Sequence, residues 1–157
     1  MTLRAWRIVK KKHAQHAFDG EGARLYGSRW STPGNRVVFV SETLSLAVLE
    51  VLVHLHMSAA LRHYVVFTGD FPEQLVQDLD KNRLPKNWRH FPAPPETQAI
   101  GDGWIRGADS LLLRVPSAVV PGEHNYLINP GHPQFSQVSI AGPKPLDVDG
   151  RVLRYKQ

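Results

Sequence analysis

The chain contains no cysteine among its 157 residues. Without thiols it can form no disulfide framework, no cysteine nucleophile and no zinc site of the cysteine type. Long apolar runs are missing too, since no stretch reaches the roughly 18 residues that a membrane span requires. The N-terminus MTLRAWRIVKKKH also lacks the apolar core of a secretory signal. We therefore expect a cytoplasmic protein with no membrane segment.

The composition is that of an ordinary globular protein. Hydrophobic residues make up 42% of the chain and charged residues 21%, which argues against disordered and fibrous classes. A chain of this length hides about two-thirds of its unfolded surface when it folds as one unit. We expect a single domain that spans residues 1–157.

The charge balance favours anionic partners. The formal net charge is +5 and the sequence pI about 9.7, which suits nucleic acid, phosphorylated small molecules or an acidic protein. The only run of basic residues is 10–12, which is typical of a solvated strand end or loop, and no zinc-finger, RNP or helix-turn-helix pattern is present. Direct nucleic-acid binding is therefore not expected. A metal site is not expected either, because His54 and His56 would lie about 200° apart on a helix.

Alternating and apolar segments predict strands at 5–9, 36–40, 64–68, 111–115 and 126–129, with strand and loop from 138 to 155. A helix is predicted from 42 to 56 with Ser41 as its N-cap, a short helix or turn at 72–79, and a helical turn at 105–109. The proline- and aromatic-rich residues 82–104 predict a surface segment that could form a lid. Strands spaced unevenly among few helices indicate an α+β fold with a mixed or mainly antiparallel sheet.

One carboxylate stands out within the predicted helix. On a helical wheel the apolar residues 44, 48, 51, 52 and 55 form a core stripe, and Glu50 projects about 200° away from Val48, among residues that are still half apolar. Burying a carboxylate without partners costs roughly several kcal/mol of folding free energy. Glu50 is therefore either simply solvated or directed into a cleft that uses its charge.

Two arginines stand beside tryptophans, in Trp6-Arg7 and Arg29-Trp30. Such arginines are commonly stacked on the surface. Together with a carboxylate on a neighbouring helix, however, they would match a dinucleotide, because guanidinium groups pair with phosphate oxygens while the carboxylate can bind ribose hydroxyls or stabilise a developing cation.

The order of several short segments resembles the RES-domain proteins, named for an arginine, a glutamate and a serine. The resemblance extends from about residue 5 to about residue 140. It rests on six segments: WRI (6–8), GSRW (27–30), VVF (37–39), LEVLVH (49–54), VPS (115–117) and NYLINPGHP (125–133).

The resemblance implies a toxin of a type II toxin–antitoxin pair, with an Xre-like antitoxin as partner and a homodimer within a larger complex. It also implies an ADP-ribosyltransferase-like fold and an activity that consumes NAD as substrate, without a metal. On this interpretation Arg29, Glu50 and Ser117 are the arginine, glutamate and serine of the family name, and Arg7 is a further family arginine.

These residues can support cleavage of the nicotinamide–ribose bond. Glu50 would stabilise positive charge on the ribose, while Arg7 and Arg29 would bind the pyrophosphate. Ser117 would donate a hydrogen bond to a phosphate or ribose oxygen, unless it only caps a turn. Asn125 is a secondary candidate. Phe39 replaces the tyrosine of many members, so that a hydroxyl contact is lost but stacking on the nicotinamide remains.

The reaction's outcome stays open at this point. NAD could be cleaved by hydrolysis or by phosphorolysis. A mono-ADP-ribosyltransferase that modifies a cellular protein is a close alternative, and a non-catalytic basic module that binds nucleic acid or an acidic partner is a distant one.

Overall fold

The structure, a computed structural model, describes residues 1–54 and 58–153. Within this part of the chain seven strands form one sheet in the order β4-β5-β6-β2-β1-β3-β7. Neighbouring strands are antiparallel except for the parallel pair β4–β5. The predicted α+β class with a mainly antiparallel sheet is confirmed. The strands are β1 Thr2–Lys10, β2 Val38–Ser41, β3 Tyr64–Pro72, β4 Val76–Asp78, β5 Leu112–Pro116, β6 His124–Ile128 and β7 Ser139–Pro145.

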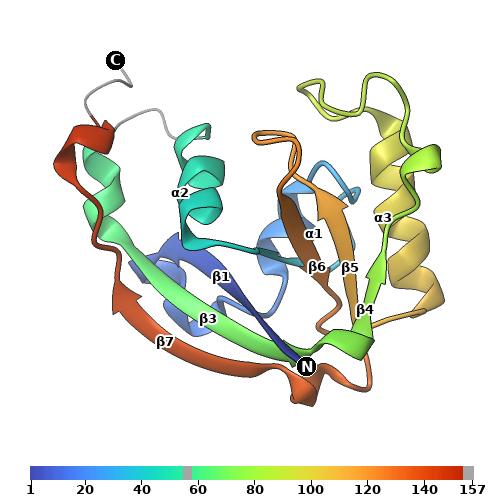
Figure 1. The fold of residues 1–157 in the computed structure, drawn as a ribbon, viewed down its shortest axis with the longest axis horizontal. Coiled ribbons are helices and arrows are strands. Elements are labelled where there is room, and N and C mark those ends of the chain that lie inside the picture. Colours follow the sequence, from blue (N-terminus) through green and yellow to red (C-terminus); the bar gives the residue numbers. More distant parts are fainter. Residues whose placement is uncertain (55–57, 154–157) are drawn as a thin grey trace.

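Helices flank this sheet. In Figure 1, α2 (Leu44–Leu52) and α3 (Pro95–Gly107) stand on opposite sides of the β5–β6 pair. None of the helices in the described ranges is long and apolar enough to cross a bilayer. The remaining helical segments are short: α1 Glu21–Tyr26, η1 Lys11–His16, η2 Ser58–His63, η3 Glu73–Leu75, η4 Lys81–Arg83, η5 Phe135–Gln137 and η6 Gly150–Leu153.

The sheet has a narrow junction between β1 and β2. Strand β1 pairs with β3 along its whole length, but it pairs with β2 only at Trp6↔Ser41. Figure 1 shows two groups of strands. The first group, β1, β3 and β7, runs across the lower left, and in the second group β4, β5 and β6, with β2 paired to β6, the labelled strands stand upright. The two groups of strands diverge from the junction, and α2 packs against both β1 and β2 there.

Helix α2 begins later than its sequence predicts. Its N-cap is Thr43, whose Oγ1 accepts a hydrogen bond from the Leu46 amide at 3.0 Å, so the prediction of Ser41 as N-cap is wrong. Ser41 instead ends strand β2. The helix ends at Leu52 and not at position 56, and the last two predicted helical residues, 55 and 56, lie outside the described ranges.

The buried face of α2 also differs from the predicted stripe. The buried residues are Leu46, Ala47 and Val48, whereas Leu44 is 37% exposed. Leu46 and Val48 lie on nearly opposite sides of the helix, so its first turns are covered on both sides. A single-stripe wheel assumes one buried face and cannot represent a helix set between two groups of strands.

The prediction of a surface segment over 82–104 is wrong from residue 95 onward. That part forms α3, whose Ile100 and Trp104 belong to the core. The prolines at 94 and 95 suggested a loop, but Pro95 occupies the first turn of the helix, where proline needs no amide donor. The interior glycines at 101 and 103 weakened the helical signal further. Strand β4 was likewise missed within the segment predicted as helix or turn at 72–79.

Helix α3 fixes the loop that follows Trp30. The buried carboxylate of Asp102 accepts hydrogen bonds from the Thr32 amide at 3.0 Å, the Thr32 hydroxyl at 2.7 Å and the Asn35 side-chain amide at 2.8 Å. Beside it, the backbone of Gly101 lies directly against the Trp30 carbonyl. This close approach sets the position of the segment that carries Arg29.

We predict that Gly101→Ala lowers the free energy of unfolding by about 3 kcal/mol or more, or prevents folding, because a Cβ there would lie 1.6 Å from the Trp30 carbonyl oxygen, a backbone atom that cannot move aside. The matched control is Gly103→Ala in the same helix, where a Cβ meets nothing within 4 Å. It should raise stability by up to about 1 kcal/mol. Urea denaturation followed by circular dichroism measures both, and equal stabilities would contradict the described packing of α3.

Candidate functional site

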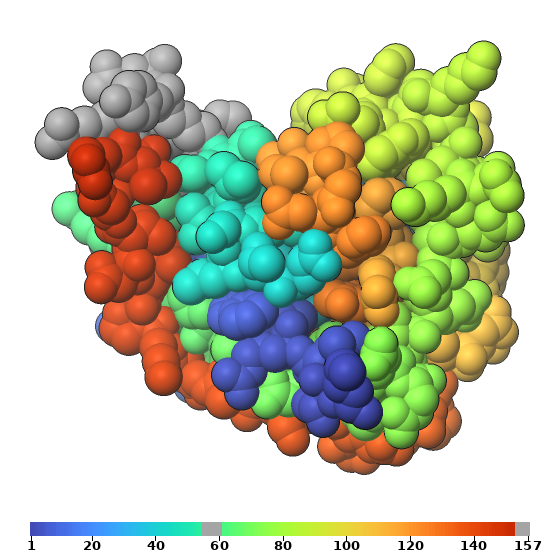
Figure 2. All heavy atoms as spheres, in the orientation of Figure 1, coloured from blue at the N-terminus to red at the C-terminus, as the bar shows by residue number. Residues whose placement is uncertain are grey.

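A cavity of about 1010 Å³ opens where the two groups of strands diverge. Its walls come from β1, the end of α1 and the loop after it, β2, α2, residues 89–93 and the neighbouring ends of β5 and β6. In Figure 2 the upper outline of the molecule is notched between cyan α2 and the yellow-green residues near 90, with the orange loop after β5 at the base of the notch. The cavity is large enough for a dinucleotide.

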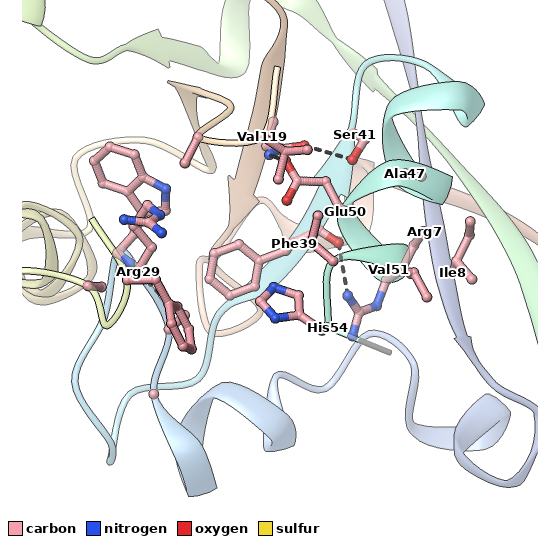
Figure 3. A pocket seen from close by; sticks show the side chains of 18 of the residues that line it. Arg7, Ile8, Arg29, Phe39, Ser41, Ala47, Glu50, Val51, His54 and Val119 are labelled. Atoms are coloured by element: carbon pink, nitrogen blue, oxygen red, sulfur yellow. Dashed lines mark hydrogen bonds between the residues drawn. The ribbon is translucent and has the colours of Figure 1, made fainter. Parts of the chain in front are cut away.

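Glu50 extends from α2 into this cavity. Its Oε1 accepts hydrogen bonds from the Ser117 hydroxyl and from the Asn125 side-chain amide, both at 2.7 Å. Across the described residues, Oε2 has no hydrogen-bond partner. Figure 3 shows the carboxylate above the Phe39 ring, with Arg29 on one side and Arg7 on the other. One oxygen is thus fixed by the protein and the other is left for a ligand.

Ser117 stands behind Glu50 and does not line the cavity. It is 0% exposed, and its Oγ accepts hydrogen bonds from the amides of Val119 and Val120 at 3.1 and 3.0 Å. With these amides occupying its lone pairs, the hydroxyl proton is directed to Glu50. The sequence predicted a contact between Ser117 and the ligand, whereas in this structure its contact is with the carboxylate.

Arg7 is fixed by backbone carbonyl oxygens on β1's side of the cavity. Its Nε donates to the Ala17 carbonyl, and its Nη1 donates to the Phe39 carbonyl at 2.9 Å. Burial lowers the pKa of Arg7 to about 10, against a smaller opposing effect of the Asp19 carboxylate. A guanidinium group whose charge is so poorly solvated gains strongly from an anion placed beside it.

Arg29 is held in the same manner on the other side. Its Nη1 donates to the carbonyls of Trp88 and His90, both at 2.7 Å, and so ties the 88–90 segment to the cavity wall. Burial lowers the pKa of Arg29; the Glu50 carboxylate raises it, and repulsion from Arg89 lowers it further. Two positive groups therefore approach each other here.

Arg89 is a cavity residue that the sequence reasoning missed. Its Nε donates to the Ala118 carbonyl at 3.0 Å, and it lines the cavity with Arg7 and Arg29. A signal was available, because Trp88-Arg89 repeats the tryptophan–arginine pairing that drew attention to Arg7 and Arg29.

The three cavity arginines differ from the arginines elsewhere on the molecule. Carbonyl oxygens hold them in place without neutralising them, and none of the three forms a salt bridge with a carboxylate in the described ranges. Five other arginines do pair with carboxylates: Arg4 with Asp70, Arg24 and Arg36 with Glu21, Arg114 with Asp78, and Arg151 with Asp149. The cavity thus holds three fixed cations that remain available to an anion.

The structure brings most of the predicted site together. Arg7, Arg29, Phe39, Glu50 and Asn125 line one cavity although they come from five different segments of the chain. The Phe39 ring lies in its centre in Figure 3. Among the described residues no group of three histidine, aspartate or glutamate side chains is arranged to hold a metal ion.

Comparison with known proteins identifies the family. The model of the RES domain matches residues 4–149. A protein named Toxin Res from Photorhabdus laumondii is 38% identical over 155 residues, which is 97% of this chain and 98% of that protein. Another protein named Toxin Res, from Yersinia enterocolitica, is 37% identical over 141 residues, covering 90% of this chain and 92% of its own length.

Two further comparisons extend this result. A protein from Sphingobium named Prs ADP-ribosylating toxin is 32% identical over 159 residues and covers 98% of this chain and 99% of its own length. A chain of the solved M. tuberculosis MbcT–MbcA toxin–antitoxin complex shares the fold, with a TM-score of 0.77 at 17% identity over 98% of this chain and 88% of that one. The chain therefore shares its fold with a chain of a toxin–antitoxin complex, and it belongs to the RES-domain family of toxins.

Proposed function

We propose that this toxin depletes NAD in the cytoplasm by cleaving the bond between nicotinamide and ribose. The observation that carries the proposal is the cavity itself, in which one carboxylate with a free oxygen faces guanidinium groups that form no salt bridge within residues 1–54 and 58–153. The lining residues carry three guanidinium charges against one carboxylate. That balance suits a ligand with a pyrophosphate at one end and a cationic ring at the other. The name of the Sphingobium relative, an ADP-ribosylating toxin, supports a substrate of this class.

On this proposal the cavity residues have the following roles. Arg7 and Arg29 bind the pyrophosphate, and the Phe39 ring between them stacks on the nicotinamide. As the C1′–N bond breaks, its electron pair passes to the nicotinamide nitrogen and positive charge gathers on the ribose. The free oxygen of Glu50 stabilises that charge, more strongly than it would in bulk water because the cavity walls are partly apolar. No acid is needed, since nicotinamide leaves as a neutral molecule.

We propose that Arg89 influences whether water or phosphate attacks the ribose. It lies close enough to Arg29 to lower that residue's pKa, and its Nε is fixed on the loop that directly follows Ser117. If Arg7 and Arg29 take the pyrophosphate, the third cation is left for a further anion, and inorganic phosphate could then replace water as acceptor. Hydrolysis yields ADP-ribose, whereas phosphorolysis yields its 1-phosphate. Transfer of ADP-ribose to a protein would use the same cavity.

The surroundings of the cavity mouth fit a protein partner. Tyr26 and Phe91, which both line the cavity, are each 82% exposed, and Val53 is 55% exposed. An Xre-like antitoxin that covers this apolar rim would block entry of NAD. We further propose that the toxin is a homodimer within the larger toxin–antitoxin complex.

Glu50→Gln should reduce nicotinamide release from NAD by about 10²–10³-fold, because the amide cannot supply the negative charge that the cleaved ribose requires. Release is measured by chromatography of purified protein incubated with NAD. Glu96→Gln, an exposed carboxylate on α3, is the control and should retain full activity. Multiple turnovers by Glu50→Gln at the rate of the unmodified protein would refute the role of this carboxylate.

Arg89→Gln should remove any acceleration of NAD cleavage by added phosphate, while a large part of the phosphate-independent rate remains. Product analysis at zero and saturating phosphate separates ADP-ribose from its 1-phosphate. Arg83→Gln, which removes an exposed arginine outside the cavity, serves as the charge-matched control. If the unmodified protein forms only ADP-ribose at every phosphate concentration, water is the acceptor and Arg89 has no part in its choice.

A further inference from the structure

We infer that Ser41 is a positioning residue for the proposed reaction, acting through Asn125 on Glu50. The inference rests on the proposed role of Glu50. From its sequence context, Ser41 was predicted only as a helix cap. In the structure it is the last residue of β2.

The contact follows from the register of the sheet. Ser41 and Asn125 are directly paired on the antiparallel strands β2 and β6. Side chains of paired residues lie on one face with Cβ atoms about 5 Å apart, within reach of a short hydrogen bond. The Ser41 hydroxyl donates to Asn125 Oδ1 at 2.7 Å. Figure 3 shows Ser41 at the Glu50 end of the cavity.

The Glu50 carboxylate can only accept, so it selects the donor end of the Asn125 amide, and the Ser41 hydroxyl helps to hold that orientation by donating to the acceptor end. A carboxamide has a donor end and an acceptor end, and rotation by half a turn exchanges them. With Oδ1 held by Ser41, Nδ2 donates to Glu50 Oε1 at 2.7 Å. In the reversed orientation an amide oxygen would face a carboxylate oxygen, which is repulsive, and Glu50 would lose one of its two donors.

Ser41 is well placed to hold this orientation. It is 5% exposed, so water has little access to compete for its hydroxyl, and it pairs with Trp6 on β1 as well as with Asn125 on β6. The Ser117 donor is oriented separately, by the amides of Val119 and Val120. Loss of Ser41 therefore disturbs one of the two donors to Glu50 and leaves the other intact, so a partial loss of rate is expected.

The test is a double-mutant cycle of Ser41→Ala and Asn125→Ala, with nicotinamide release from NAD as the assay. Ser41→Ala should lower kcat by roughly fivefold to tenfold, the effect of one hydrogen bond, and leave KM within about twofold, since its hydroxyl is engaged by Asn125 and the proposed pyrophosphate ligands are Arg7 and Arg29. In the Asn125→Ala background, Ser41→Ala should cause no further loss of kcat. If Ser41→Ala does not fold, Ser41→Cys takes its place, because it keeps the side-chain shape with a somewhat larger γ atom and weakens the donor.

Ser110→Ala is the matched control. It removes a half-buried hydroxyl that accepts from the Trp104 indole and donates to the Leu112 carbonyl, outside the cavity. It should lower thermal stability and leave kcat unchanged. An unchanged kcat in Ser41→Ala, or losses that multiply in the double variant, would overturn the role of Ser41.

A second measurement does not depend on catalysis. The side-chain amide signals of Asn125, identified in nitrogen-15 NMR spectra by their loss in Asn125→Ala, should shift and exchange faster with water in Ser41→Ala but not in Ser110→Ala. If the unmodified protein releases no nicotinamide, the proposed function fails, and these signals alone test the contact. If the Asn125 signals are the same with and without the Ser41 hydroxyl, Ser41 does not position Asn125.

Discussion

The hydrogen bonds that Glu50 accepts from Ser117 and Asn125 fix the geometry of the whole site. A carboxylate in half-apolar surroundings is costly unless donors satisfy it. Here the donors come from the end of β5 and from β6, so the bonds that make Glu50 tolerable also tie α2 to that part of the sheet. This explains why an acidic residue stands in the otherwise apolar run of α2: its hydrogen bonds attach the helix to the sheet.

The electrostatics of the cavity depend on what holds its arginines. A carboxylate would fix a guanidinium group and cancel its charge, whereas a backbone carbonyl fixes it and leaves the charge in place. Arg7, Arg29 and Arg89 are all held by carbonyls. Their donors also reach distant segments, and Arg29 joins the wall of the cavity to the 88–90 segment. The positive charge of the cavity and its shape thus depend on the same contacts.

The sequence predicts some parts of this protein well and others not at all. Strands near 5–9, 36–40 and 64–68 were predictable because apolar alternation and turn residues are local signals. The meeting of Arg7, Arg29 and Glu50 followed from charge pattern and family resemblance. Helix α3 was hidden by prolines that lie at its start and by interior glycines, of which Gly101 packs against Trp30. The pairing of Ser41 with Asn125 depends on strand register across 84 residues of chain, which a single sequence does not encode locally.

The junction at Trp6↔Ser41 has a mechanical consequence. Only one residue pair joins β1 to β2, although this is where the two groups of strands meet. Tension applied across the sheet, from β7 toward β4, would concentrate on that link and on α2 above it. The molecule would come apart first at Ser41, so that the contact between Ser41 and Asn125 would be lost while β1–β3 and β5–β6 stayed paired.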